Sequence, residues 1–146
     1  MILMVPLVLL LVLFFLLIVP FGWQTALRVS LAGMFLLAAS AHWGKRRPDL
    51  IRMVPKSFPR PELMVTLTGI CEILGAVGLL VPPFARWAAI GLTLLLIAVF
   101  SANIRAAREG ITIGGKPATP LLARSLIQGF FLIATMAVAM AMASNG

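Results

Sequence analysis

The sequence predicts an all-α integral membrane protein, a helical bundle that crosses the bilayer five times. Hydrophobic residues make up 62% of its 146 residues and charged residues only 11%, whereas a soluble domain is nearer half apolar and a quarter charged. So small a protein cannot hide this excess in its interior, because much of any short chain stays at the surface. Five apolar segments also approach the roughly 20 residues that a membrane-spanning helix needs. We therefore expect one transmembrane domain over residues 1–146.

The expected helices are separated by proline, glycine and charged residues. Residues 20–23 predict a tight turn, residues 44–61 a polar, proline-rich connection, and residues 110–120 a Gly/Pro-rich loop; Pro82 and Pro83 are expected to end a helix. The first apolar segment lacks the basic start and the small-residue cleavage site of a signal peptide, so we expect it to be retained. The predicted helices cover residues 2–19, 24–43, 62–81, 85–107 and 121–143.

The net charge of +8 reflects basic residues that lie between the apolar segments. This placement follows the positive-inside rule and does not indicate a nucleic-acid-binding protein. Most of the basic residues fall in loops on one side of the membrane, and only Arg28 and Arg86 fall on the opposite side. The positive-inside rule therefore predicts a cytoplasmic N-terminus and an external C-terminus in the cell (inner or plasma) membrane. The remaining basic residues are Lys45, Arg46, Arg47, Arg52, Lys56, Arg60, Arg105, Arg108, Lys116 and Arg124.

The aromatic residues agree with this orientation. Trp23 and Trp87 fall near the predicted outer boundary and Trp43 near the inner one, as in the aromatic belts of membrane proteins.

A single cysteine and a single histidine limit the cofactor chemistry. Cys71 has no second cysteine to pair with, which excludes an intramolecular disulfide and a cysteine cluster, and we interpret it as a small packing residue. His42 has no second histidine beside it, so we expect no metal site built from protein ligands alone.

Glu72 is the main candidate for a functional residue, because it lies midway along the third predicted helix. An ionised side chain at the centre of a membrane helix costs about 2.5–3.5 kcal/mol. The expected partner is Arg28 on the second helix, about 9 Å away in depth at a rise of 1.5 Å per residue. Two interpretations stay open: the pair ties two helices together, or it contributes to a ligand site. Arg28 could also extend to the interface instead.

Two stripes of residues could bring polar groups together on the second and third helices. His42, with an ordinary pKa of about 6.5, would suit either a proton relay or an interfacial hydrogen bond. Glycines in the third helix would let a neighbouring helix approach closely. The stripes consist of Arg28, Phe35 and His42, and of Thr66, Gly69, Glu72 and Ala76.

Three further polar residues occur in the fourth and fifth helices. Asn103 lies near the end of the fourth helix and either helps to end it or contacts a ligand. Gln128 and Thr135 are seven residues apart, so both can point into the bundle. Such residues join helices more often than they bind ligands.

Several short motifs occur in a fixed order along the chain: Ala-Ala-Ser-Ala-His-Trp at 38–43, Met-Val-Pro at 53–55, Phe-Pro-Arg-Pro-Glu at 58–62, Thr-Gly-Ile-Cys-Glu-Ile-Leu-Gly at 68–75, and Phe-Ser-Ala-Asn-Ile at 100–104. With these motifs the chain resembles the DoxX family of small membrane proteins, from about Arg28 to the end of the fifth helix. The resemblance implies a four-helix DoxX-like core, which the second to fifth predicted helices supply, and the additional N-terminal helix departs from the family pattern or marks a subgroup. It also implies motif roles for Arg28, His42, Glu72 and Asn103.

The resemblance implies several functions, because DoxX-like proteins have been linked to membrane-bound thiosulfate:quinone oxidoreductase, to oxidative-stress complexes and distantly to receptor-assembly chaperones. Our first hypothesis is a membrane-anchor subunit of a redox system, without enzyme activity of its own. A quinone-like or lipid ligand would lie between the second and third helices, and a partner would hold the electron-transfer cofactor. The ligand candidates are Arg28, His42, Glu72, Asn103 and Gln128.

The basic residues 44–61 would dock a cytoplasmic redox protein or contact anionic lipid. The alternative hypothesis is a non-catalytic assembly or scaffold protein, with or without oligomerisation. A small transporter or proton pathway is a third hypothesis and ranks below the other two, because no inverted repeat or broken helix is evident.

Overall fold

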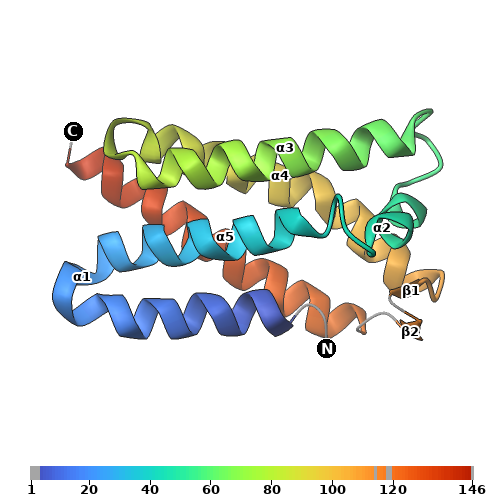
Figure 1. Cartoon of the computed structure of the whole chain (residues 1–146), viewed down its shortest axis with the longest axis horizontal. Coiled ribbons are helices and arrows are strands. Elements are labelled where there is room, and N and C mark those ends of the chain that lie inside the picture. The colour runs from blue at the N-terminus through green and yellow to red at the C-terminus, as the bar shows by residue number, and fades with distance from the viewer. Residues whose placement is uncertain (1–3, 114, 118–119, 146) are drawn as a thin grey trace.

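The computed structural model describes residues 4–113, 115–117 and 120–145 and shows a bundle of long helices lying side by side (Figure 1). The long helices pack in a ring in which α1 contacts α3, α3 contacts α4, α4 contacts α5, and α5 returns to α1. The two strands are short and pair antiparallel, Thr112 with Pro117 and Ile113 with Lys116. The elements are α1 (Met4–Ser40), α2 (Arg47–Met53), α3 (Pro61–Leu80), α4 (Pro82–Arg108), β1 (Thr112–Ile113), β2 (Lys116–Pro117) and α5 (Leu121–Ser144).

Helix α1 folds back on itself at Gly22. It has 37 residues, which would extend about 55 Å if straight. Gly22 adopts φ 78° and ψ 164°, a conformation that is essentially restricted to glycine. The two halves return side by side (Figure 1), and a Cβ atom on Gly33 would lie 2.9 Å from the Leu13 side chain. The reversal involves fewer residues than the turn predicted for residues 20–23, because the chain remains helical through Pro20.

The prediction of a helical, multi-pass membrane protein is confirmed. Among the described residues, four helices, α1, α3, α4 and α5, are long and apolar enough to cross a membrane. Large apolar side chains are exposed along them, for example Phe15 at 69% and Leu94 at 63%. These side chains find a suitable solvent only in lipid.

Most predicted helix boundaries agree with the structure to within a few residues, with three corrections. Helix α1 ends at Ser40, before the predicted residue 43, and the polar connection contains the unpredicted helix α2. Pro82 and Pro83 form the first turn of α4, where proline is well tolerated because that turn has no intrahelical acceptors for its N–H groups. The predicted start at residue 2, and residues 114, 118 and 119 of the Gly/Pro-rich loop, lie outside the described residues.

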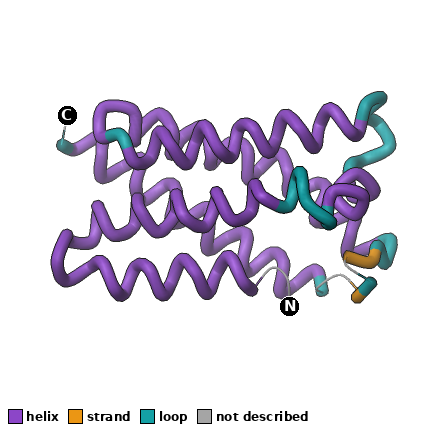
Figure 2. The backbone as a smooth tube through the Cα atoms, viewed as in Figure 1, coloured by secondary structure: helices purple, strands orange, loops and turns teal. Residues whose placement is uncertain are grey.

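The bundle has two different ends, visible in Figure 2. We call the one that carries α2, the β1–β2 pair and their loops the basic end. The opposite end carries the reversal at Gly22, the α3–α4 connection and the end of α5. Between them the core is apolar, and small residues let α3 and α4 approach closely: a Cβ on Gly75 would lie 2.5 Å from Leu92, and one on Gly78 would lie 2.7 Å from Ala88.

Candidate functional site

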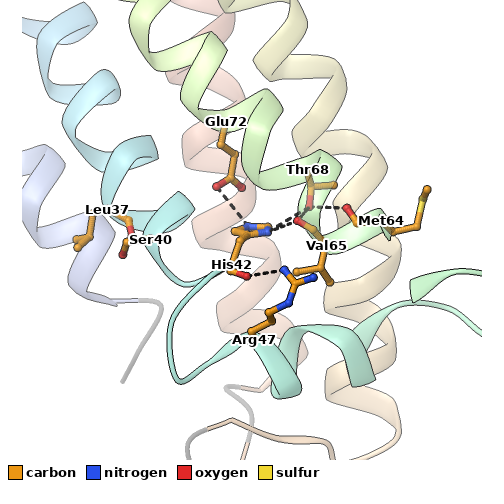
Figure 3. A network of polar contacts seen from close by, with 8 residues as sticks. All are labelled: Leu37, Ser40, His42, Arg47, Met64, Val65, Thr68 and Glu72. Carbon is orange, nitrogen blue, oxygen red and sulfur yellow. Dashed lines mark hydrogen bonds and ion pairs between the residues drawn. The ribbon is translucent and has the colours of Figure 1, made fainter. Parts of the chain in front are cut away.

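His42 and Glu72 form an ion pair near the basic end (Figure 3). The His42 Nε2 atom lies 3.4 Å from Glu72 Oε2, and the two side chains are only 11% and 13% exposed. His42 lies in a turn that continues α1, because the N–H groups of Ala41 and His42 donate to the carbonyls of Ala38 and Ala39. Glu72 projects toward it from α3. The predicted contact between the two stripes is therefore confirmed at this pair.

The other ring nitrogen of His42 is fixed by the backbone of α3. Nδ1 lies 2.6 Å from the Val65 carbonyl oxygen, which can only accept, so Nδ1 carries a proton. Thr68 Oγ1 lies 3.3 Å from the same nitrogen. Nε2 therefore remains as the titrating atom, and it faces a carboxylate oxygen. The contact is favourable only if one proton lies on Nε2 or on Oε2, because two unprotonated atoms would repel each other.

The charge state of His42 depends on opposing effects. Burial lowers its pKa, whereas the Glu72 carboxylate, through hydrogen bonding and charge, and the Val65 carbonyl raise it. The positive charge of Arg47 acts in the lowering direction. The net result is a pKa above the ordinary value of 6.5, so His42 holds its second ring proton more firmly than a free histidine does.

Arg47, the first residue of α2, holds the turn against α3. Its guanidinium donates to the His42 carbonyl oxygen (2.8 Å), to Thr66 Oγ1 (2.9 Å) and to the Glu62 carbonyl oxygen (3.2 Å). Our sequence analysis placed Arg47 only among the basic loop residues. Nothing in the sequence separates it from its neighbours, because its role depends on where α2 packs.

Gly69 allows the close approach of this turn to α3. A Cβ atom there would lie 2.7 Å from the Trp43 ring and 2.8 Å from the His42 side chain. The predicted role of Gly69 in close packing is thus confirmed. The contact also leaves no space for a ligand between His42 and α3 at this level.

Arg28 does not pair with Glu72, so that expectation is wrong. Its Nε atom donates to the Leu79 carbonyl oxygen at 2.8 Å, and its Nη2 atom to the Leu80 carbonyl oxygen at 3.4 Å. These carbonyls end α3 at the opposite end of the bundle. A cation is stabilised there because the last carbonyls of a helix lack intrahelical donors and carry partial negative charge.

A second polar cluster joins α4 to α5. Asn103 accepts a hydrogen bond from Arg124 Nη1 (2.8 Å) and donates to Gln128 Oε1 (3.3 Å), and Gln128 Nε2 donates to the Leu96 carbonyl oxygen (2.6 Å). Arg124 and Gln128 are only 2% and 7% exposed. Helix α4 continues to Arg108, so Asn103 joins helices and does not end one.

The burial of Arg124 was missed in the sequence, where the residue counted as a loop cation. A signal was present: Arg124, Gln128 and Thr135 share one face of α5 at helical spacing. Thr135, predicted to point inward, is fully buried and accepts a hydrogen bond from Thr93 Oγ1 at 2.8 Å.

The five candidate residues therefore form separate groups. His42 and Glu72 pair between α1 and α3, Asn103 and Gln128 join α4 to α5, and Arg28 caps α3. In the part of the chain that the structure describes, no three His, Cys, Asp or Glu side chains gather in a metal-binding arrangement. Cys71 is exposed on α3 and so is not a packing residue of the interior.

The fold and its buried polar groups define a multi-pass helical membrane protein whose charged loops gather at one end. Comparison with known families adds a more specific assignment. A family model described as "Domain of unknown function (DUF8561)" matches residues 31–142, and the chain belongs to this family. No curated protein and no solved structure shows significant similarity to the chain.

Proposed function

We propose that the protein is a membrane-anchor subunit of a redox system and presents the His42–Glu72 pair to a polar, quinone-like head group. The observation that carries this proposal is the 3.4 Å contact between Nε2 and Oε2, which holds one proton at the edge of the membrane domain. The resemblance to the DoxX family supports the same function.

The packing around the pair determines where a head group can approach. The turn after α1 is in close contact with Gly69, so the ligand reaches Glu72 from the lipid side of α3 and not from between the helices. Glu72 Oε2 is a buried oxygen whose contact with His42 Nε2, at 3.4 Å, is longer than an ordinary hydrogen bond. A carboxylate oxygen accepts more than one hydrogen bond, so a hydroxyl donor on a head group would bind it beside His42.

A bound quinone would supply chemistry that takes up two protons with two electrons. The residues of this chain hold and move the proton: His42 Nε2 carries it, Glu72 stabilises it, and the Val65 carbonyl keeps the imidazole in a fixed orientation. In this proposal the electrons come from a cofactor that belongs to a partner protein.

The orientation in the proposal has five crossings, because each half of α1 is long enough to span the hydrocarbon core. The basic end then faces the cytoplasm of the cell membrane, with the N-terminus inside and the C-terminus outside. Exposed cations in the connection between α1 and α3 dock the acidic surface of a soluble redox protein. These are Lys45, Arg52, Lys56 and Arg60.

Native mass spectrometry of the protein purified gently from its host membranes tests this function. A retained quinone-mass ligand should be present in the unchanged protein and lost in Glu72→Gln. The matched control is Glu62→Gln, the same substitution on the exposed first turn of α3, and it should retain the ligand. Protein that carries only ordinary lipids would contradict the proposal.

One observation favours a scaffold protein as the second candidate. The buried polar groups mostly bind one another or the backbone, as Arg47 and Gln128 do, and such contacts can serve only to fix helix positions. A scaffold would lose folded yield in Glu72→Gln, whereas a redox subunit would keep its yield and lose its ligand.

A further inference from the structure

Helix α2 lies at the basic end and is bound to a different neighbour at each of its ends. At its beginning, the Arg47 guanidinium binds the His42 turn and α3. Just after its last residue, the Val54 carbonyl oxygen accepts a hydrogen bond from Arg105 Nη1 of α4. The helix also contacts β1. One short helix therefore joins the His42 turn and α3 to α4 and β1.

The Arg47 side chain is the link between α2 and the His42–Glu72 pair (Figure 3). Its Nη1 atom donates to the His42 carbonyl oxygen, and its Nη2 atom donates to Thr66 Oγ1 and to the Glu62 carbonyl oxygen of α3. A planar guanidinium holds such acceptors in a fixed geometry. We propose that Arg47 is a positioning residue, and that through it the position of α2 determines the contact between the His42 ring and Glu72. The inference rests on the proposed function for its partner, since a protein docked on α2 would then act on the pair.

The charged groups that act on the His42 ring come from two helices and act in opposite directions. Burial lowers the pKa of His42 most, the Glu72 carboxylate of α3 raises it by hydrogen bonding and by charge, and the Val65 carbonyl raises it further. The charge of Arg47 in α2 lowers this pKa, and its effect is the smallest. In the described part of the chain, α4 and α5 contribute no charged group that acts on the ring. Arg47 therefore affects the ring more by holding it beside Glu72 than by its charge.

The single histidine of the chain makes a direct test possible. Isotope labelling of histidine gives one imidazole spectrum by NMR, and its nitrogen shifts report the proton on Nε2 as the pH of the detergent solution is changed. In Arg47→Gln the turn is released from α3, so the pKa of His42 should fall toward its ordinary value of 6.5. A rise would mean that Arg47 acts by charge alone. Either a rise or an unchanged pKa would overturn the positioning role.

Thr66→Val is a milder variant that serves even if Arg47→Gln does not fold. It removes one acceptor of Arg47 on α3 and changes no charge, so the pKa of His42 should fall in the same direction and by less. The matched control is Arg108→Gln, which removes an exposed cation at the basic end and should titrate as the unchanged protein does. A fall in the control as large as that in Arg47→Gln would contradict a specific role of Arg47.

Arg105→Gln tests the coupling from the other end of α2, because it releases the Val54 carbonyl oxygen. The pKa of His42 should fall in this variant, and the fall should disappear in the Arg47→Gln background, where the link is already broken. Glu109→Gln is the control, since it removes the 3.0 Å ion pair of Arg105 and keeps the contact with Val54. An unchanged pKa in Arg105→Gln, or a fall that persists without Arg47, would overturn the coupling through α2.

These titrations require neither a quinone nor a partner protein, so they separate the coupling from the proposed function. If the pKa of His42 does not respond to Arg47 and Arg105, the coupling is wrong, even where native mass spectrometry still finds a ligand that depends on Glu72. If the pKa responds and no ligand is found, the coupling holds and the redox function is wrong.

Discussion

At the scale of single residues, the orientation of the His42 ring decides what the His42–Glu72 pair can do. Nδ1 is engaged by the Val65 carbonyl oxygen, so the ring cannot exchange its two nitrogens between partners. Only Nε2 gains or loses a proton, and it does so directly against Glu72. The strength of the pair therefore follows the protonation of the His42 ring.

The first prediction concerns the pH dependence of stability. The folded-state pKa of His42 lies above its ordinary value of 6.5. The pair therefore stabilises the protein fully below the ordinary value, and this contribution is lost as the pH rises through the raised pKa. At pH about 6, Glu72→Gln should lower the free energy of unfolding by about 1–3 kcal/mol. Melting temperatures in detergent, measured from about pH 6 to about pH 9, should converge for the variant and the unchanged protein.

Glu62→Gln serves as the control for this series, because Glu62 is exposed and only its backbone oxygen takes part in the Arg47 contacts. Its melting temperature should parallel that of the unchanged protein at every pH. A difference between Glu72→Gln and the unchanged protein that stays constant with pH would show that His42 does not titrate against Glu72.

The second prediction concerns the contact of Gly69 with the His42 turn. A methyl group there would overlap the Trp43 ring and the His42 side chain, so Gly69→Ala should destabilise the protein by about 1–3 kcal/mol. Gly91→Ala is the matched control, because nothing lies within 4 Å of a Cβ at that position in α4. Alanine favours a helix over glycine by up to about 1 kcal/mol, so the control should melt no lower than the unchanged protein. Equal melting temperatures for the two variants would mean that the turn moves freely.

At the scale of the elements, the reversal within α1 depends on one backbone conformation. The third prediction is that Gly22→Ala destabilises the protein by about 1–3 kcal/mol, because φ 78° with ψ 164° is strained for a residue with a Cβ atom. No neighbouring atom lies within 4 Å, so the effect would come from the backbone alone. Thermal unfolding in detergent measures it, with Gly129→Ala in α5 as the control of equally open surroundings. A variant as stable as the control would show that the chain reverses in another way.

The joint between α4 and α5 rests on Asn103, which contacts both Arg124 and Gln128. The fourth prediction is that Asn103→Leu lowers the free energy of unfolding by about 1–3 kcal/mol, because Arg124 and Gln128 each lose one of their hydrogen bonds in a buried setting. Ser101→Ala is the control, since the exposed Ser101 hydroxyl binds only a carbonyl of its own helix. Its stability in the same detergent should change by less than about 0.5 kcal/mol. A neutral Asn103→Leu would mean that Arg124 and Gln128 are satisfied without it.

At the scale of the whole molecule, the path of α1 determines how many times the chain crosses the membrane. The fifth prediction uses single cysteines in a Cys71→Ser background, labelled with a membrane-impermeant thiol reagent in intact cells. Five crossings place Met4→Cys and Lys56→Cys on the cytoplasmic side, where the reagent does not reach them. Phe21→Cys, Phe84→Cys and Ser144→Cys should be labelled from outside. Opposite results for Met4→Cys and Lys56→Cys would show that α1 crosses once.

The sequence accounted for the membrane class, most helix boundaries and the gathering of cations between α1 and α3. It did so because the length and apolar content of a spanning segment are set by the bilayer, residue by residue along the chain. The contact of His42 with Gly69 of α3 was also within reach of the sequence, since helical spacing places the two residues on stripes that could face each other.

The pairing of charges could not be predicted in the same way. Glu72 pairs with His42 and not with Arg28, Arg28 caps α3, and Arg124 is buried beside Asn103. Each of these contacts depends on the depth and rotation of a helix relative to its neighbours, which are set by packing at small residues such as Gly69 and Gly75. The sequence by itself determined that the chain lies in a membrane and where its spanning segments fall. Only the tertiary structure decided which polar groups meet, because helix positions come from packing and not from the apolar content of each segment.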